Sequence, residues 1–172
     1  MSKLTPEELV ERTLDGAYAL AMQLSGDSSD AWDLVQESLS RAVRALPGFR
    51  GESDPKTWVY RIVVNVWKNK VKSRAWRWWR GLVSLGPDLP EPASAEPPLD
   101  SGMQKAEDLE ALDRALASLE PEDRAALALR ELEGKSYSEI ADILAVPMGT
   151  VKSRLYRARS ALARLLENRD AA

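Results

Sequence analysis

The sequence predicts an all-α protein of two small helical domains joined by an extended, acidic, Pro-rich linker. We expect a three-helix bundle in residues 1–80, the linker in residues 81–104 and a helix-turn-helix domain in residues 105–172. Apolar residues recur at i, i+3 and i+4 in both outer parts of the chain, which is the helical period. The middle part holds five of the ten prolines, four acids and no cation, so it cannot build a core.

The composition excludes several classes of site. The 172 residues include no Cys and no His, which excludes disulfides, thiol nucleophiles, imidazole bases and ordinary zinc sites, and no cofactor is expected. There is no signal peptide and no apolar run near the ~20 residues that span a bilayer, so we expect a soluble, cytoplasmic protein.

Charge is segregated along the chain, although the net charge is only −3. Residues 68–80 carry six cations and no acid, whereas residues 107–142 carry eleven acids and four cations. An acidic protein should bind DNA poorly by itself, because its surface repels the duplex.

The first helix begins at Thr5, which can cap it, with Pro6 in the first turn and Glu8 completing a capping box. It ends at Ser25-Gly26-Asp27. Its expected buried stripe is Val10, Leu14, Ala17, Ala21 and Leu24.

The second helix follows the serines at 28 and 29 and is amphipathic. Its expected buried side chains are Ala31, Leu34, Val35, Leu39, Ala42, Val43 and Leu46. Its expected outer face is Asp33, Gln36, Glu37, Ser40, Arg41 and Arg44.

A loop over residues 47–54 leads to a third helix that begins at Asp54-Pro55. Its expected inward residues are Val59, Ile62, Val63 and Val66, and the opposite stripe is Arg61, Asn65, Lys68 and Lys72. Trp67, Trp76, Trp78 and Trp79 then alternate with cations, a mixture that suits stacking on unpaired bases or a partner protein, and equally suits packing within the bundle.

After the linker, two further helices are expected before the helix-turn-helix. The first carries Leu109, Leu112, Leu116 and Leu119, and the second carries Ala125, Leu129 and Leu132. Glu120-Pro121 separates the two helices and Gly134 ends the second.

Residues 135–165 contain the clearest motif, two helices joined by a tight turn. Ser136 and Glu139 form a capping box for the first helix, and Ala145-Val146-Pro147 makes the turn. The second helix should bury Val151, Leu155, Ala158, Leu162, Leu165 and Leu166. Its outward residues should be Gly149, Ser153, Tyr156, Arg157 and Ser160, with Lys152 on the flank. These side-chain types suit a helix in a DNA major groove, although a core helix with a solvated basic face has the same periodicity.

Over nearly its whole length the chain resembles the extracytoplasmic-function (ECF) group of bacterial RNA polymerase sigma factors, in the sigma-70 family. The N-terminal part resembles region 2 of that family in the segments Asp33–Glu37, Ala45-Leu46, Phe49–Gly51 and Thr57–Ile62, with Asn65. The C-terminal part resembles region 4 in Arg130–Gly134 and Tyr137–Arg159. Two departures stand out: Pro55 replaces a large apolar residue, and Ala145 replaces the usual turn Gly, which should cost about 1 kcal/mol at positive φ.

The resemblance implies a transcription initiation factor with three binding surfaces and no catalytic residues. Core polymerase would be bound by Asp33, Gln36, Glu37 and Arg41. The minus-ten element would be bound, with one base flipped from the non-template strand, by Phe49, Arg50, Gly51, Glu52, Ser53, Asp54, Arg61, Asn65, Lys68 and Lys72. The minus-thirty-five duplex would be read by Thr150, Lys152, Ser153, Tyr156, Arg157 and Arg159.

The implied partners are core RNA polymerase, promoter DNA both as duplex and as melted non-template strand, and an anti-sigma factor. The linker would follow the RNA exit path of the polymerase. The main alternative is a free-standing helix-turn-helix regulator whose N-terminal bundle senses a ligand or forms a dimer. An enzyme is disfavoured because the carboxylates have neither a metal motif nor a nucleophile beside them.

Overall fold

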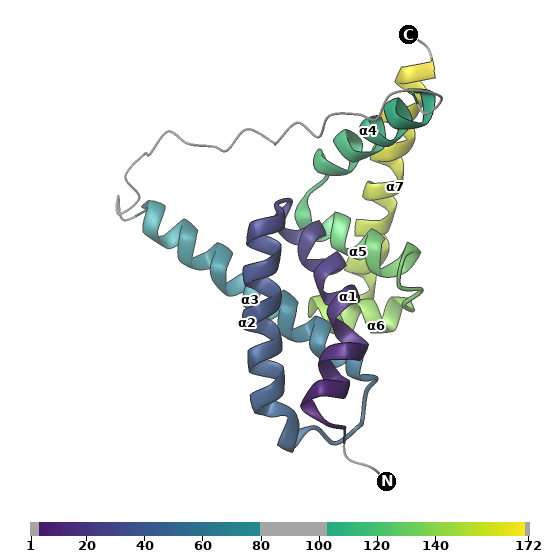
Figure 1. The fold of residues 1–172 in the computed structure, drawn as a ribbon. Coiled ribbons are helices and arrows are strands. Elements are labelled where there is room, and N and C mark those ends of the chain that lie inside the picture. Colours follow the sequence, from purple (N-terminus) through teal and green to yellow (C-terminus); the bar gives the residue numbers. More distant parts are fainter. Residues whose placement is uncertain (1–3, 80–102, 171–172) are drawn as a thin grey trace.

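The computed structural model describes residues 4–79 and 103–170, and every regular element in these ranges is a helix (Figure 1). The N-terminal half consists of α1 (Pro6–Ser25), α2 (Ser28–Ala45), the 3-10 turn η1 (Leu46–Gly48) and α3 (Pro55–Trp79). The C-terminal half consists of α4 (Met103–Ala117), α5 (Pro121–Glu131), α6 (Tyr137–Leu144) and α7 (Met148–Asp170). The predicted all-α architecture is confirmed, and α4 begins two residues before the predicted start of the C-terminal domain at residue 105.

Both predicted capping boxes are present. The Thr5 hydroxyl accepts from the Glu8 backbone N–H and the Glu8 carboxylate accepts from the Thr5 backbone N–H, at 3.2 and 2.9 Å. Ser136 and Glu139 make the same pair of bonds at the start of α6, at 3.1 and 2.7 Å. These bonds satisfy N–H groups that have no acceptor inside the helix, which is why both helices begin where the sequence predicts.

The turn between α6 and α7 requires a left-handed residue. Ala145 occupies it, with φ 54° and ψ 50°, and it is the only residue other than Gly with positive φ in the described chain. The predicted strain at this position is therefore present.

The buried arc of α1 is wider than predicted and rotated from the predicted stripe. Leu9 and Leu20 are buried, whereas the predicted Val10 and Leu14 are only half-buried. The reason is that α1 contacts α2, α3 and α5, so neighbours cover it on more than one side. In α2 the buried residues Ala31, Leu34, Val35, Leu39 and Ala42 are those predicted, with Val43 and Leu46 at the edge.

Helix α3 is covered on two sides. Val59, Val63 and Val66 are buried as predicted, but Tyr60 and Val64 are buried as well, and Ile62 is only half-buried. One side of α3 meets α1 and α2 and another meets α6. Apolar residues therefore occupy two faces of this helix instead of forming a single stripe.

Several leucines predicted to be buried in the C-terminal half are exposed. Leu109 and Leu112 of α4 are 62% and 36% exposed, and Leu132 is 70% exposed. Leu165 and Leu166, near the end of α7, are about two-fifths exposed. The prediction was wrong here because the main contact of α4 is with α7, so Leu109 and Leu112 have little to cover them, while Leu132 lies just after α5 and Leu165 and Leu166 lie near the end of α7.

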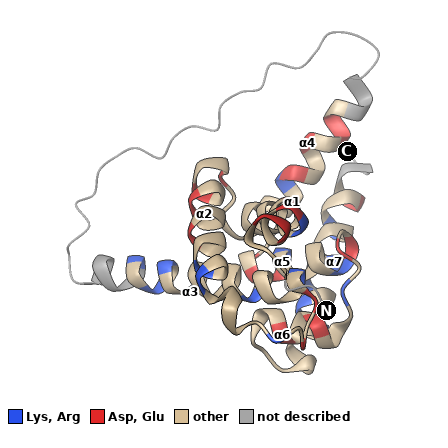
Figure 2. Cartoon of the chain, turned by 60° about the horizontal axis from the view of Figure 1, so that its bottom comes forward, with Lys and Arg blue, Asp and Glu red and all other residues tan. Residues whose placement is uncertain are grey.

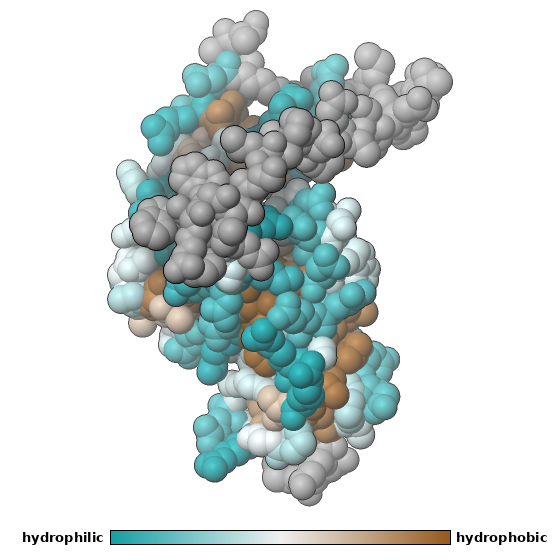
Figure 3. Space-filling view, turned by 90° about the vertical axis from the view of Figure 1, so that its left-hand side faces the viewer, coloured by the Kyte–Doolittle hydropathy of each residue, from teal (hydrophilic) through white to brown (hydrophobic). Residues whose placement is uncertain are grey.

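The two halves pack against each other. Helix α1 contacts α5 and helix α3 contacts α6, and the buried apolar residues of both halves form one connected cluster (Figure 1). On the face in Figure 3, hydrophobic side chains reach the surface in patches surrounded by hydrophilic ones. Among the described residues, no helix is long and apolar enough to cross a membrane.

Candidate functional site

The residues predicted to bind core polymerase lie together on the outer face of α2. Asp33, Gln36 and Arg41 are exposed and Glu37 is half-buried. Arg41 Nη2 donates to Glu37 Oε1 at 2.6 Å, and Lys70 Nζ of α3 lies 3.3 Å from Glu37 Oε2. Burial alone would raise the pKa of Glu37, but the hydrogen bonds from Arg41 and Lys70 outweigh it and lower that pKa. Glu37 is therefore a paired carboxylate.

The loop from Phe49 to Asp54 is folded back onto α3. The Phe49 ring lies 4.7 Å from the Trp58 ring, centroid to centroid, and Gly51 turns the chain at φ 72°. Asp54 Oδ2 lies 3.4 Å from Lys135 Nζ of the C-terminal half. Arg50, Gly51, Glu52 and Asp54 are exposed, and Phe49 and Ser53 are half-buried. The predicted minus-ten loop thus presents polar groups to solvent on an aromatic support.

The predicted basic stripe of α3 is only partly accessible. Asn65 and Lys72 are exposed, whereas Arg61 and Lys68 are half-buried. Lys68 Nζ donates to the backbone carbonyl of Leu144, at 2.6 Å. Within the described part of the chain, Arg61 Nε is buried and has no hydrogen-bond acceptor. Figure 2 shows cations following one another along α3, with acids on α2 and α4.

The predicted minus-thirty-five residues mostly lie on the open face of α7. Lys152, Ser153, Tyr156 and Arg159 are exposed, Tyr156 to 74%, and Thr150 is half-buried. Arg159 Nη2 donates to Glu131 Oε1 at 2.7 Å, and the hydrogen bonds to Glu131 and Tyr137 raise the pKa of Arg159. These side chains form a basic, aromatic surface that suits a duplex groove.

Arg157 differs from the other α7 residues because it is bound to α5. Its Nε and Nη2 donate to the two carboxylate oxygens of Asp123, at 3.1 and 3.0 Å, and Asp123 is buried. These bonds raise the pKa of Arg157. The neighbouring Arg154 forms an ion pair with Glu122. In this conformation the guanidinium group of Arg157 links α7 to α5.

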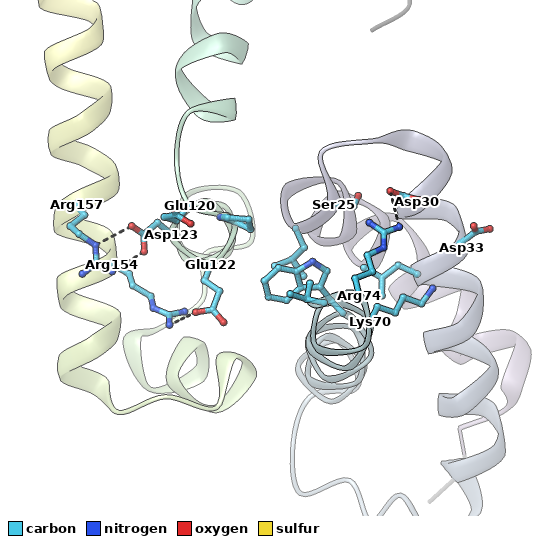
Figure 4. A pocket seen from close by; sticks show the side chains of 15 residues that line it. Ser25, Asp30, Asp33, Lys70, Arg74, Glu120, Glu122, Asp123, Arg154 and Arg157 are labelled. Atoms are coloured by element: carbon cyan, nitrogen blue, oxygen red, sulfur yellow. Dashed lines mark hydrogen bonds and ion pairs between the residues drawn. The ribbon is translucent and has the colours of Figure 1, made fainter. Parts of the chain in front are cut away.

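A groove of about 600 Å³ separates α5 and α7 from α2 and α3 (Figure 4). Arg154 and Arg157 line one wall and Asp33, Lys70 and Arg74 line the other. Its apolar lining includes Leu34, Trp67 and Val71. The groove is therefore lined both by Asp33 of the predicted polymerase surface and by Arg154 and Arg157 of the predicted DNA-reading helix.

The sequence reasoning missed the residues that join the two halves. Lys135 is buried between them, Tyr60 Oη donates to Glu133 Oε2 at 2.8 Å, and Arg124 Nε donates to the Gln23 carbonyl at 2.9 Å. The signal in the sequence was that the apolar residues Tyr60 and Val64 fall outside the predicted inward stripe of α3. The side chains of Trp76, Trp78 and Trp79, and nearly all of the predicted linker, lie outside the described residues. In the described residues, no group of three or more acids could hold a metal ion.

Comparison with known proteins gives matches for both halves. The family model for Sigma-70 region 2 matches residues 9–77, and that for Sigma-70, region 4 matches residues 109–162. The RNA polymerase sigma-H factor of Pseudomonas aeruginosa is 35% identical over 161 residues, which are 86% of this chain and 79% of that protein. The ECF RNA polymerase sigma-E factor of Escherichia coli is 40% identical over 144 residues, which are 78% and 73% of the two chains.

A solved structure covers almost the whole chain. It is the sigma factor RpoE in complex with the anti-sigma factor NepR from Bartonella quintana, with a TM-score of 0.72 at 28% identity, covering 94% of this chain and 96% of that one. The order of the two matched regions, the identities and this shared fold agree with the motifs read from the sequence. The chain therefore belongs to the ECF group of the sigma-70 family, the alternative sigma factors that direct RNA polymerase to promoters.

Proposed function

We propose that this protein binds core RNA polymerase through α2 and opens the minus-ten element with α3 and the loop before it, while α7 reads the minus-thirty-five element. The observation that carries the proposal is that one chain matches regions 2 and 4 together. It acts as a specificity subunit in the cytoplasm, and the chemistry of RNA synthesis belongs to the polymerase.

The polymerase contact is assigned to the outer face of α2. Asp33 and Gln36 are exposed there, and Glu37 and Arg41 form an ion pair beside them. An exposed carboxylate such as that of Asp33 complements a basic clamp surface, which would orient the two proteins and speed their encounter. Because Glu37 is already paired with Arg41 and Lys70, Asp33 is the cleaner probe of this contact.

The minus-ten contact is assigned to the loop of residues 49–54 and to Arg61, Asn65, Lys68 and Lys72. Extruding a base costs a few kcal/mol, which the pocket must recover through hydrogen bonds and stacking. The Asn65 amide offers donors and an acceptor to a base edge, and the cations suit the phosphates that flank it. Phe49 and Trp58 provide an aromatic support beneath the loop.

The minus-thirty-five contact is assigned to Thr150, Lys152, Ser153, Tyr156, Arg157 and Arg159. Lys152 and Arg159 suit guanine edges or phosphates, and the Tyr156 ring suits a thymine methyl group. Arg157 can contact DNA only if it releases Asp123. Its contribution to DNA affinity therefore depends on a competition between the Asp123 carboxylate and the DNA for the same guanidinium.

We assign an anti-sigma factor as a further partner. The similar sigma factor RpoE was solved in complex with the anti-sigma factor NepR. The groove in Figure 4 is lined by both halves of this chain, with mixed charges and apolar side chains. A partner segment seated there would cover Asp33 and contact Arg157, and so would block polymerase and promoter together.

The test of the polymerase contact is Asp33→Lys, with Asp15→Lys as its control. Both residues are exposed acids, on α2 and α1 respectively, so each change alters the net charge equally. Exposed charges usually contribute under ~1 kcal/mol to stability, so both variants should melt normally. Affinity for core polymerase, measured at two salt concentrations, should fall only for Asp33→Lys, and more strongly at low salt.

Two results would contradict the proposal in different ways. Wild-type affinity in a normally melting Asp33→Lys variant would remove α2 from the polymerase interface. Failure of the wild-type protein to bind core polymerase would favour the free-standing regulator.

A further inference from the structure

The two halves of the protein are joined by polar contacts between α3, with the loop before it, and the segment from Glu133 to Leu144. We propose that three of these contacts form a latch that closes the free protein: Lys135 with Asp54 and Thr57, Tyr60 with Glu133, and Lys68 with Leu144. The closed form engages Asp54 and Lys68 of the minus-ten surface with the C-terminal half, and it leaves Lys152, Ser153 and Tyr156 of the minus-thirty-five face open. This inference rests on the proposed function for the identity of those surfaces.

Lys135 is the centre of the latch. Its Nζ lies 3.3 Å from Thr57 Oγ1, 3.4 Å from Asp54 Oδ2 and 3.8 Å from Glu139 Oε1, and the residue is 8% exposed. A buried ammonium group is tolerated only when it is paired. Because Asp54 belongs to the other half, separation of the halves returns both charges to water and restores their hydration. The contact is therefore specific in geometry yet reversible.

The second contact passes beside α1 at Gly16. Tyr60 is fully buried, and a Cβ atom at Gly16 would lie 1.7 Å from Tyr60 Oη and 3.2 Å from Glu133 Oε1. Gly16 thus provides the space in which the Tyr60 hydroxyl reaches Glu133. Burial, followed by the Glu133 carboxylate, raises the pKa of Tyr60, so the hydroxyl keeps its proton and acts as the donor.

The third contact joins Lys68 to the C-terminal end of α6. The carbonyls at a helix end lack partners inside the helix and carry its negative partial charge. Lys68 Nζ donates to one of them, that of Leu144, at 2.6 Å. The amine is thereby held against protein instead of nucleic acid.

The latch therefore uses members of the proposed minus-ten surface. Asp54 and Lys68 are both assigned to that surface and both contact the C-terminal half. Lys152, Ser153 and Tyr156 of α7 remain exposed in the same conformation. Opening the latch should consequently change binding to one promoter element and spare the other.

Two variants test the latch through conformation. Lys135→Met removes the central charge, and Tyr60→Phe removes one hydroxyl at nearly constant shape. Since the chain has no Cys, fluorophores can be placed on Ser40→Cys of α2 and Ala163→Cys of α7, both exposed. Energy transfer between them should fall in each variant relative to the labelled wild type.

The same variants test the latch through binding. Affinity for a single-stranded minus-ten oligonucleotide should rise by about tenfold or more, the effect of one lost hydrogen bond to a charged group. Affinity for a minus-thirty-five duplex should not rise. Removing a cation weakens DNA binding in general, so a gain in Lys135→Met has the opposite sign to the bulk electrostatic effect.

A matched control separates opening from loss of charge. Arg12→Met removes an exposed cation from α1, outside the latch, and should leave energy transfer unchanged. Unchanged energy transfer in both latch variants overturns the latch. Reduced transfer without any gain in single-strand binding overturns the inference that the latch competes with single-stranded DNA for Asp54 and Lys68. The proposed function is tested apart from this, by permanganate reactivity of a minus-ten element in wild-type holoenzyme.

Discussion

The backbone at Ala145 is strained, and the strain has a measurable consequence. Its φ of 54° places the Cβ atom against the next carbonyl, which costs an Ala about 1 kcal/mol that a Gly avoids. We expect Ala145→Gly to raise the free energy of unfolding by about 1 kcal/mol in urea titrations. Ala163→Gly, at an exposed helical position of α7, should lower it by a similar ~1 kcal/mol. Equal losses in the two variants would show that the turn carries no strain.

Individual cations on α7 are not equivalent, although the sequence presents them as one basic face. The Arg157 guanidinium is bonded at two points to the buried Asp123, whereas Lys152 is exposed on the same helix. Replacing Arg157 therefore removes the partner of a buried carboxylate as well as any DNA contact. A loss of promoter binding in an Arg157 variant would therefore reflect both the destabilised contact between α5 and α7 and the lost DNA contact.

Among the elements, α7 offers the clearest test of DNA recognition. Lys152→Ala should weaken binding of the holoenzyme to a minus-thirty-five duplex by ~1–3 kcal/mol if the amine contacts a base edge, and should relax specificity at that position. Arg164→Ala, which removes an exposed cation further along α7, is the control for charge. A footprint with full upstream protection in Lys152→Ala would remove this residue from the recognition surface.

The length of α6 makes its first turn important. The helix has only 8 residues, too few to be stable alone, so its capping box and its contacts with α3 and α7 hold it in place. The backbone N–H of Ser136 lowers the pKa of Glu139, despite the opposing effect of burial. The capping box is therefore fully formed at neutral pH. Its contribution to the free energy of unfolding is lost as the pH falls through the folded-state pKa of Glu139.

At the scale of the whole molecule, the closed arrangement conflicts with a promoter that has two separated elements. A flexible segment as long as the predicted linker, about 24 residues, has an end-to-end distance of ~25–29 Å as a coil and ~74 Å as fully extended polyproline II. Two elements about two duplex turns apart lie ~70 Å from each other. The packing of α1 on α5 and of α3 on α6 must therefore open before one molecule can bind both.

We expect the isolated wild-type protein to bind a full promoter fragment weakly, with dissociation constants roughly in the micromolar range or above at physiological salt. Core polymerase should strengthen that binding greatly, because it would hold the two halves apart. Fluorescence anisotropy with and without core polymerase, on matched and scrambled promoters, measures both quantities. Tight and promoter-specific binding by the protein alone would contradict the closed resting state and support a free-standing regulator.

The sequence by itself determined the helices, the turn and the family. Capping boxes, the Gly26 helix end and the strain at Ala145 depend on groups within a few residues of one another, so they can be read locally. The outward position of Lys152 and Tyr156 follows from the helical period for the same reason. The region 2 and region 4 motifs are enough to identify the family without the tertiary structure.

Only the tertiary structure decided which faces meet. That α6 lies on α3, that Arg157 bonds to Asp123, and that Lys135 is buried between the halves depend on contacts across 34 to 81 residues of sequence. The exposure of Leu109 has the same origin, since the main contact of its helix is with α7. Periodicity reports that a face is apolar or charged, but its partner is set by how the whole chain packs, because burial is non-directional and any complementary surface can cover it.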